Sequence, residues 1–296
     1  MKKVPPFGPF GGDEALPENP EKARVTVVPV PYEANPSYGE GAADGPFHIL
    51  SASGQMEMTD EETGRFWPEI GVLTLPPWDV PGEPDRMVEF LDRAAEGIFR
   101  KGTRPLFLGG DHAVTFPLVR AAARAHPGLG VLQIDAHTDL RHTWNGSVYN
   151  HACVMRRIVG DLGISSVAVG IRSFCALEAA FMAETGYRPF FAHHIAGSDG
   201  SWMEEAVERL PEKVYLTVDL DGLDPSVMPG TGTPEPGGLS YRELVALIRL
   251  VGKRRRVVAA DVVELCAFPG SSVSEYTAAR VAQKIIHFAL SEEGQI

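Results

Sequence analysis

Cysteine is scarce in this sequence of 296 residues, which contains only Cys153, Cys175 and Cys266, far apart from one another. Three scattered thiols exclude a disulfide framework and do not have the paired spacing of a structural zinc site. The sequence also lacks a run of about 20 apolar residues, so no membrane span is expected. Residues 1–3 are followed by prolines and glycines rather than by the apolar core of an export signal, which predicts a cytoplasmic protein with reduced thiols.

Positively charged residues are also fewer than acidic ones. Lysine and arginine together number 27 against 39 aspartates and glutamates, which gives a formal net charge of −12. A chain this acidic is repelled by nucleic acid and by anionic membranes, so neither is expected as the main partner. The same charge suits a small cationic substrate. The hydrophobic share of 44% and the charged share of 22% are typical of a globular enzyme.

Apolar β-rich runs alternate with segments of helical periodicity along most of the chain. The predicted strands are 25–30, 105–108, 130–134, 167–171, 214–218 and 256–263. The predicted helices are 87–100, 117–125, 152–159, 177–184, 203–210, 241–251 and 276–290. This alternation favours βαβ units and an α/β fold with a largely parallel sheet and helices on both faces.

The N-terminal residues differ in composition from the rest of the chain. Residues 1–24 are polar and rich in proline and glycine, which predicts an extended N-terminal arm. No internal repeat and no long linker divides the remainder, so we expect one catalytic domain over residues 25–296.

Runs of acidic and histidine residues follow directly on three of the predicted strands. They are Asp135-Ala136-His137-Thr138-Asp139, Asp219-Leu220-Asp221 and Gly109-Gly110-Asp111-His112. Side chains two residues apart in an extended segment point to the same side, so the polar groups of each of the first two runs can gather. In a parallel α/β sheet, ligands bind beyond the carboxyl ends of the strands, which is where all three runs lie.

The residues of these runs have the composition of a site for two metal ions. Four carboxylates would repel one another unless cations lay among them, and two divalent cations would neutralise them. The donors are rich in oxygen and include no thiolate, which favours Mn²⁺ over a structural zinc ion. A water shared by two such ions loses a proton near neutral pH and becomes a nucleophile. The candidate ligands are His112, Asp135, His137, Asp139, Asp219 and Asp221.

One acidic residue of the runs is not expected to be a ligand. Asp111 would point away from His112 in an extended segment, so it is predicted to be a turn or supporting residue. The pair His193-His194 has no acidic neighbours in the sequence and is predicted to be structural.

The three runs resemble the signatures of the ureohydrolase family, which includes arginase and agmatinase. The second signature is extended here to Asp219-Leu220-Asp221-Gly222-Leu223-Asp224-Pro225. The likeness begins near Val25, covers nearly the whole remaining chain, and includes Ser37-Tyr38-Gly39-Glu40-Gly41 and Asp261-Val262-Val263-Glu264. The resemblance implies a three-layer α/β sandwich around an eight-stranded parallel sheet, two Mn²⁺ ions per chain, and a homotrimer or homohexamer.

The resemblance also implies a role for each site residue. His151 matches the family's proton-shuttling histidine, and Glu264 matches the carboxylate that holds the substrate guanidinium. Ala113 departs from the family, which usually has a serine after the histidine; the change removes a hydroxyl next to His112 but no ligand. By position, Asp135 and Asp219 would bridge the ions, with His112 and Asp139 completing one site and His137 and Asp221 the other.

The chemistry of the residues agrees with those roles. A guanidinium stays protonated at physiological pH, so it needs a carboxylate partner, which Glu264 could supply. The amine that leaves must be protonated. Asp139 could relay that proton, and an ordinary histidine such as His151 titrates in the range needed to exchange protons with solvent.

The leading prediction is a Mn²⁺-dependent amidinohydrolase that cleaves agmatine to urea and putrescine. The loop 141–150 lacks the run of Ser, Thr and Asn with which arginases hold the substrate's carboxylate and amino group, and Arg141 is its one charged donor. The segment 150–157 also looks more like agmatinases. Aminopropylagmatine, guanidinobutyrate, arginine and guanidine remain open as substrates on the same core.

Two other classes remain as alternatives. A binuclear phosphoesterase would need basic groups near the metals, for which only Arg141 and the pair Arg156-Arg157 are candidates. A catalytically silent relative would usually have lost ligands, whereas all the matching positions are filled here.

Overall fold

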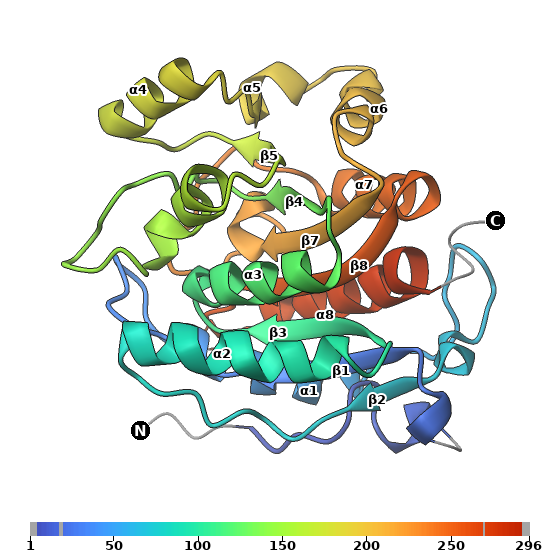
Figure 1. Ribbon diagram of the computed structural model, residues 1–296. Coiled ribbons are helices and arrows are strands. Elements are labelled where there is room, and N and C mark those ends of the chain that lie inside the picture. Colours follow the sequence, from blue (N-terminus) through green and yellow to red (C-terminus); the bar gives the residue numbers. More distant parts are fainter. Residues whose placement is uncertain (1–4, 18–19, 269, 292–296) are drawn as a thin grey trace.

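The computed structural model describes residues 5–17, 20–268 and 270–291. Eight strands form one sheet in which every neighbouring pair is parallel (Figure 1). Their order across the sheet is β2-β1-β3-β8-β7-β4-β5-β6. The strands are β1 Val25–Val30, β2 Val72–Thr74, β3 Arg104–Gly109, β4 Gly130–Ile134, β5 Ser166–Ile171, β6 Phe190–Phe191, β7 Lys213–Asp219 and β8 Arg256–Val263.

Helices pack on both faces of this sheet, so the chain has the three-layer α/β architecture that was expected. One face is covered by α2, α3 and α4, which share a hydrophobic cluster with Phe107 and Tyr215 of the sheet. The other face is covered by α1, α6, α7 and α8. The helices are α1 Gly45–Ser53, α2 Pro84–Phe99, α3 Thr115–Ala125, α4 Ala176–Thr185, α5 Ala192–Ile195, α6 Ser201–Glu208, α7 Tyr241–Arg254 and α8 Val273–Ile285.

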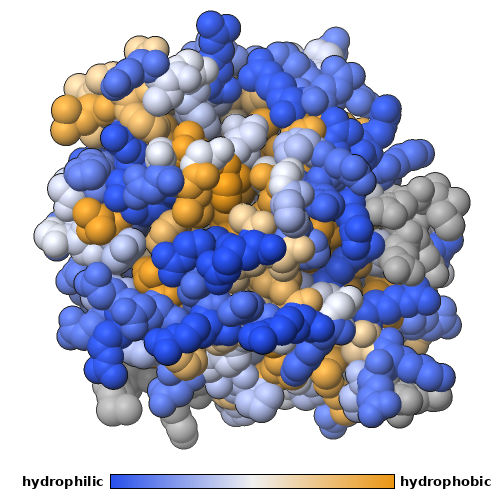
Figure 2. Space-filling view, viewed as in Figure 1, coloured by the Kyte–Doolittle hydropathy of each residue, from blue (hydrophilic) through white to orange (hydrophobic). Residues whose placement is uncertain are grey.

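Helix α2 shows how the sequence pattern produces this packing. Its buried residues Met87, Val88, Leu91, Ala95 and Ile98 recur at intervals of one helical turn and form one stripe. The outer side of the helix is hydrophilic, and Figure 2 shows hydrophilic side chains along the surface over α2. Pro84 lies in the first turn, where its missing N–H removes no hydrogen bond.

All six strands and all seven helical segments predicted from the sequence are present, with boundaries shifted by a few residues. The predicted helix 152–159 is divided into a short 3-10 helix, His151–Cys153, and a π-helical turn, Arg156–Asp161. The last helix likewise ends in a π-helical turn, Ile286–Leu290. Sequence patterns did not predict β2 and β6, nor the helices α1 and α5.

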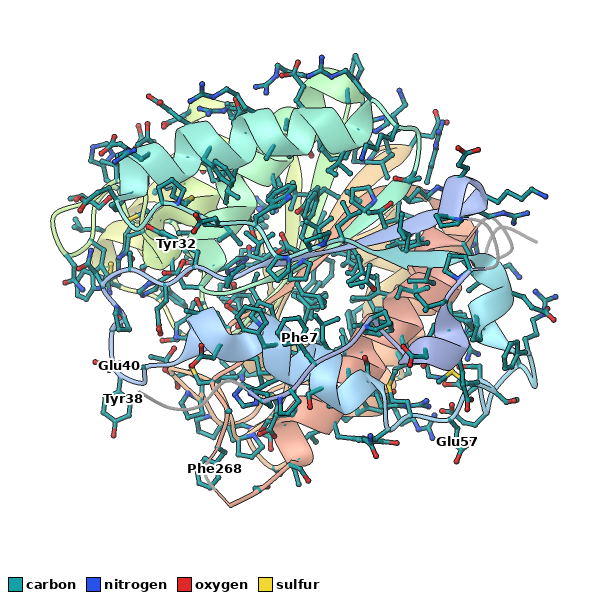
Figure 3. The ribbon with its side chains drawn as sticks, turned by 90° about the horizontal axis from the view of Figure 1, so that it is seen from below. Phe7, Tyr32, Tyr38, Glu40, Glu57 and Phe268 are labelled. Atoms are coloured by element: carbon teal, nitrogen blue, oxygen red, sulfur yellow. The ribbon has the colours of Figure 1, made fainter. Side chains whose placement is uncertain are left out.

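The described part of the N-terminal segment contacts the body of the protein more closely than an extended arm would. It contains two 3-10 turns, Asp13–Ala15 and Pro20–Lys22. Phe10 is only 1% exposed and packs edge-on against Trp67. Phe7 lies against α1, where its ring centroid is 4.9 Å from that of Phe47 (Figure 3). Phe10, and in part Phe7, therefore supply apolar surface that holds this segment against the protein.

Within the described residues, no helix is both long enough and apolar enough to cross a membrane.

Candidate metal centre and cavity

The sheet order brings the predicted ligands together. β3, β8, β7 and β4 are four adjacent strands in the middle of the sheet. Because all are parallel, their carboxyl ends meet at one edge, and the residue runs that follow them converge there. His112 follows β3, Glu264 follows β8, Asp219 ends β7, and Asp135 follows β4.

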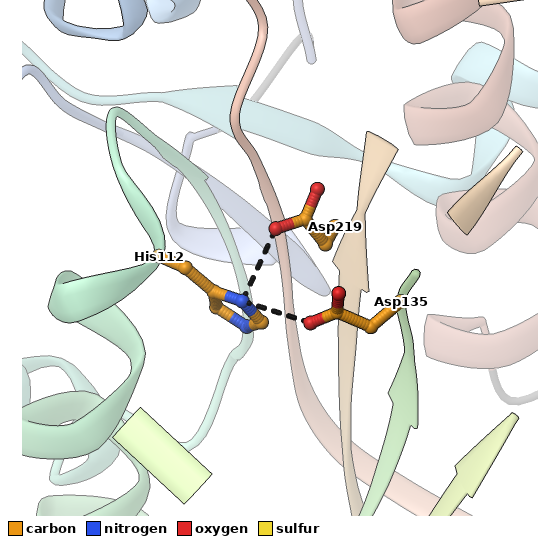
Figure 4. A group of neighbouring side chains, drawn as sticks. All are labelled: His112, Asp135 and Asp219. Atoms are coloured by element: carbon orange, nitrogen blue, oxygen red, sulfur yellow. Dashed lines mark ion pairs between the residues drawn. The ribbon is translucent and has the colours of Figure 1, made fainter. Parts of the chain in front are cut away.

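The first group of ligands surrounds the imidazole of His112 (Figure 4). Its Nδ1 atom lies 3.2 Å from Oδ2 of Asp135, 3.1 Å from Oδ2 of Asp139 and 3.2 Å from Oδ2 of Asp219. Donor atoms bound to one divalent cation at about 2.1 Å lie about 3 Å from one another. The donor atoms of His112, Asp135 and Asp219 also lie within 4.8 Å of one another, which is compatible with a common cation, and Asp139 approaches the same Nδ1 atom.

The second group surrounds His137. Its Nδ1 atom lies 3.0 Å from Oδ2 of Asp221 and 3.7 Å from Oδ1 of Asp135. Asp135 thus presents one carboxylate oxygen to each histidine, which is the position of a residue shared between two cations. Asp139 lies on the His112 side and Asp221 on the His137 side, as the family resemblance implies. Asp219, which that resemblance makes a second shared ligand, groups with His112 and Asp135.

Two observations test whether cations fit this site. The Nδ1 atom of His112 is buried and makes no hydrogen bond among the described residues, although three carboxylate oxygens surround it. Burial, together with the charge of Asp135, raises the pKa of Asp139 to about 7, and burial with the charges of Asp221 and Asp135 raises the pKa of Asp219 well above its ordinary value. Such carboxylates bind protons at neutral pH unless a cation takes the place of the proton. The donor set therefore fits a divalent cation.

The ligands are oriented by neighbours that the sequence pattern did not reveal. Thr217 Oγ1 lies 2.9 Å from Nε2 of His112, which leaves Nδ1 facing the carboxylates. Gln133 Nε2 donates to Oδ2 of Asp135 at 2.9 Å. Both residues point inward from the strands that carry the ligands, and such supporting contacts fix ligand orientation.

The Gly-Gly-Asp-His run has a purely structural requirement at its second glycine. A Cβ atom at Gly110 would lie 1.8 Å from the carbonyl oxygen of Tyr32, so no other residue fits. The close approach lets Asp111 N donate to that same oxygen at 2.8 Å. The Asp111 carboxylate accepts from Ala34 N and Ala113 N, which confirms its predicted supporting role.

Glu264 and Asp139 are held in a strained backbone conformation. Their φ angles are 67° and 52°, in the left-handed region that glycine favours. Among the described residues only Asn35 and Asn145 share this feature without being glycine, and both lie in loops beside the cavity. Strain of this kind costs of order 1 kcal/mol or more and typically occurs at functional sites.

Glu264 is placed to bind a cation in the cavity. Its Oε1 atom accepts a hydrogen bond of 2.6 Å from the backbone N–H of His112, and the side chain stays partly exposed to the cavity. Burial and the charge of Asp111 raise the pKa of the carboxyl well above its ordinary value. A guanidinium next to this carboxylate would offset that cost because it supplies the missing positive charge.

The predicted proton shuttle, His151, also lines the cavity. Burial and the nearby charges of His112 and His137 lower the pKa of His151 to about 4. This differs from the near-neutral titration expected of an ordinary histidine. At pH 7 the imidazole is therefore neutral and has a lone pair with which to accept a proton. Its Nε2 atom lies 2.8 Å from Oγ of Ser37.

These residues share one cavity of about 280 Å³ at the carboxyl edge of the sheet. Its floor is made by Glu264 and by the candidate ligands other than Asp135, and its walls come from the loops 33–39, 141–152 and 173–178. Tyr38 is 85% exposed at the rim and points away from the body of the protein (Figure 3). The size and the enclosure suit a small molecule rather than a macromolecule.

His193 and His194 lie outside this cavity, on the short helix α5. Their rings pack against each other and against Phe191. Among the described residues, no carboxylate joins them in a candidate metal group.

The fold and this site together define an arginase-like α/β protein. The solved structure of an agmatine ureohydrolase of Thermoplasma volcanium superposes with a TM-score of 0.86 at 27% sequence identity, covering 97% of this chain and 96% of that one. A model of the arginase family matches residues 23–288. The chain therefore belongs to the arginase family and is a hydrolase of that family.

Two curated relatives are similar over nearly their full length. The N(1)-aminopropylagmatine ureohydrolase of Synechocystis sp. is 39% identical over 274 residues, which cover 90% of this chain and 89% of the relative. The agmatinase of Bacillus subtilis is 32% identical over 273 residues, which cover 90% of each chain. The resemblance seen in the sequence motifs thus extends across the whole domain.

Proposed function

We propose that this protein is a Mn²⁺-dependent amidinohydrolase that releases urea from a guanidino compound with a cationic tail. The sequence alone favours agmatine. The 39% identical relative is named for N(1)-aminopropylagmatine and the 32% identical one for agmatine, so we place the aminopropyl derivative first and agmatine second. Two Mn²⁺ ions per chain and a trimeric or hexameric assembly belong to the same proposal and rest on the family resemblance.

The observation that carries the choice of a cationic tail is the position of Arg141. Among the described residues that line the cavity, it is the only lysine or arginine. Its guanidinium lies 4.1 Å from the ring centroid of Trp144, and its Nε atom lies 4.0 Å from a carboxylate oxygen of Glu178. Arg141 therefore interacts with the Trp144 ring and with Glu178, and its guanidinium is not directed to a substrate carboxylate.

The carboxylates of the cavity favour a cation as well. Besides the candidate ligands, Glu33, Glu178 and Glu264 line it. A substrate carboxylate would enter this negative field without a partner, and leaving such a charge unpaired in a buried site costs several kcal/mol. A substrate with an ammonium tail meets no such penalty.

The residues of the cavity divide the reaction between them. When bound by the six ligands, the divalent cations lower the pKa of water and so supply a nucleophile at neutral pH. Glu264 holds the guanidinium by a charge-assisted hydrogen bond and places its carbon near the ligands. Asp139 borders the cavity and can carry a proton to the amine that leaves. His151, neutral at pH 7, accepts protons from the site at a ring nitrogen and passes them to solvent.

Substrate preference tests the proposal directly. We expect kcat/KM for N(1)-aminopropylagmatine and agmatine to exceed that for arginine and for 4-guanidinobutyrate by at least ~10²-fold, equivalent to about 2.7 kcal/mol. The measurement is urea release by Mn²⁺-loaded protein at saturating and limiting concentrations of each compound. A preference for arginine or guanidinobutyrate would show that Arg141 leaves Glu178 to pair with the substrate carboxylate. No urea from any of the four would refute the proposed activity.

Replacing His151 tests the proton-transfer role. His151→Asn should lower kcat on the order of 10²-fold, the usual contribution of one general acid–base group, and leave the metal content unchanged. Elemental analysis of the purified variant is the control. If the variant loses metal in proportion to activity, His151 is a ligand and the assigned role is wrong.

A further inference from the structure

Two loops that are far apart in sequence meet at the mouth of the cavity. The Trp144 Nε1–H donates to Oγ of Ser37 at 3.0 Å, across 107 positions of sequence. Beside this contact, the Asn145 amide donates to the carbonyl oxygen of Asn35 at 3.5 Å. Asn35 and Asn145 have φ angles of 55° and 48°, so the backbone of each loop is held in a left-handed turn beside its partner. The two loops are therefore joined by defined hydrogen bonds.

Ser37 links this contact to His151. Its Oγ atom lies 3.0 Å from the indole nitrogen and 2.8 Å from Nε2 of His151. An indole N–H can only donate, so the serine oxygen accepts from Trp144, and its own O–H is free to donate to the imidazole. When that O–H points to Nε2, Nε2 accepts and the proton of the neutral ring lies on Nδ1; when Nε2 carries the proton, the second lone pair of the serine oxygen accepts it.

The indole itself is held from the other side. The Arg141 guanidinium covers its ring, and Arg141 approaches Glu178. The Glu178 carboxylate accepts from Thr138 Oγ1 at 2.8 Å and from the backbone N–H of Leu140 at 3.0 Å, so it is fixed to the segment that carries Asp139. The position of Trp144 is thus set relative to the candidate metal centre.

The serine loop is also held on both sides of Ser37. The Glu33 carboxylate accepts from the backbone N–H groups of Gly41 and Ala42. Gly39 N donates to the carbonyl oxygen of Gly232 at 3.0 Å. Tyr38 points outward, which leaves the hydroxyl of Ser37 facing His151. A hydroxyl in a loop fixed in this way is suited to orient a neighbouring ring.

We infer that Ser37 and Trp144 are positioning residues that orient the His151 imidazole. The inference rests on the proposed function, in which His151 transfers protons. Both residues act through the ring nitrogen of His151, Ser37 directly and Trp144 by way of Ser37. Losing a contact that orients a functional histidine typically costs 10- to 100-fold.

The first experiment measures steady-state urea release by Ser37→Ala, Ser37→Thr and Trp144→Phe. Ser37→Ala should lower kcat about tenfold with little change in KM, and Ser37→Thr should restore most of the loss because it keeps the hydroxyl. Trp144→Phe keeps a ring beneath Arg141 but removes the N–H, so a smaller loss is expected. Ser201→Ala, at an exposed serine that begins α6, is the matched control and should be unchanged.

The second experiment separates positioning from a general structural role. In a His151→Asn background, Ser37→Ala should change kcat less than twofold, because the ring on which it acts is gone. A full tenfold loss in that background would overturn the inference, as would wild-type activity of Ser37→Ala alone. Loss of metal from Ser37→Ala would also overturn it. These outcomes leave the proposed function standing, whereas a wild-type enzyme that releases no urea would refute the function itself.

Discussion

Replacing Asp135 with alanine should remove divalent cations from both ligand groups at once and lower urea release at least ~10³-fold. Asp135 is the residue that the two groups share, with one oxygen near His112 and the other near His137. Catalytic metal ions stabilise a transition state by several kcal/mol, and a thousandfold corresponds to about 4 kcal/mol. The measurement combines elemental analysis with urea release.

A graded comparison makes this prediction sharper. Asp221→Ala removes a ligand only from the His137 group, so it should leave more metal bound than Asp135→Ala does. Asp199→Ala, at an exposed carboxylate in a loop, should keep the full metal content. Wild-type protein that holds a single ion, or an Asp135→Ala variant with undiminished metal, would contradict a shared ligand.

A second large effect is expected far from the cavity, at Lys284 on α8. Its side chain is fully buried, and its Nζ atom lies 2.5 Å from Oδ2 of the fully buried Asp60, 3.0 Å from Glu61 and 3.2 Å from Glu62. These acids belong to a loop between α1 and β2. The lysine therefore fastens that loop to the helix that covers one face of the sheet.

Lys284→Met should lower the free energy of unfolding by about 3–5 kcal/mol at pH 7, because it removes the lysine that neutralises the buried Asp60 charge. Denaturant unfolding at pH 7 measures the loss. Lys253→Met, an exposed lysine near the end of α7, is the matched control and should change stability by less than about 1 kcal/mol. Adding Asp60→Asn to Lys284→Met should recover part of the loss, because the amide keeps an acceptor for the loop but carries no charge.

The same cluster sets an acid limit to stability. Burial is the largest single influence and opposes ionisation of Asp60 and Glu61. The contacts of Lys284, together with those of Gln283 at Asp60 and of Arg280 at Glu61, outweigh it, so the pKa of Asp60 is lowered and the pKa of Glu61 is lowered to about 2. Carboxyls with a pKa lower in the folded state than in the unfolded chain stabilise the fold above about pH 4, and this contribution is lost as pH falls toward 2. The destabilisation by Lys284→Met should therefore be largest near neutral pH and shrink in acid. A difference that stays constant from pH 7 to pH 3 would contradict the assignment.

The sequence was informative where a chemical requirement falls on consecutive or alternating residues. Asp135, His137 and Asp139 could be recognised because an extended segment places alternate side chains together, and the central strands are long apolar runs. β2 and β6 were missed because three or two residues cannot show a period. α1 was missed because its buried residues include a glycine, a proline and a serine, which weaken the apolar stripe.

Contacts between distant segments were beyond the reach of sequence patterns. Thr217 and Gln133 are ordinary polar residues within strands, and nothing in their local sequence distinguishes them from residues that face solvent. Glu178 is the third residue of α4, where an acid is common for reasons of helix capping alone. Only the fold shows that Thr217 and Gln133 contact candidate ligands and that Glu178 contacts the segment carrying Asp139. The pKa of His151 was also beyond sequence patterns. A near-neutral value was expected, but burial and the charges of His112 and His137 lower it to about 4.

The short outer strands have a consequence for how copies of this protein can meet. β2 has three residues and β6 has two, and these strands form the two borders of the sheet. A border strand exposes unpaired backbone N–H and C=O groups that can template pairing with another chain. Borders this short offer too few such groups to extend the sheet from one molecule into the next. Any assembly of several chains must therefore join helices and loops, and aggregation by strand addition is disfavoured by the architecture itself.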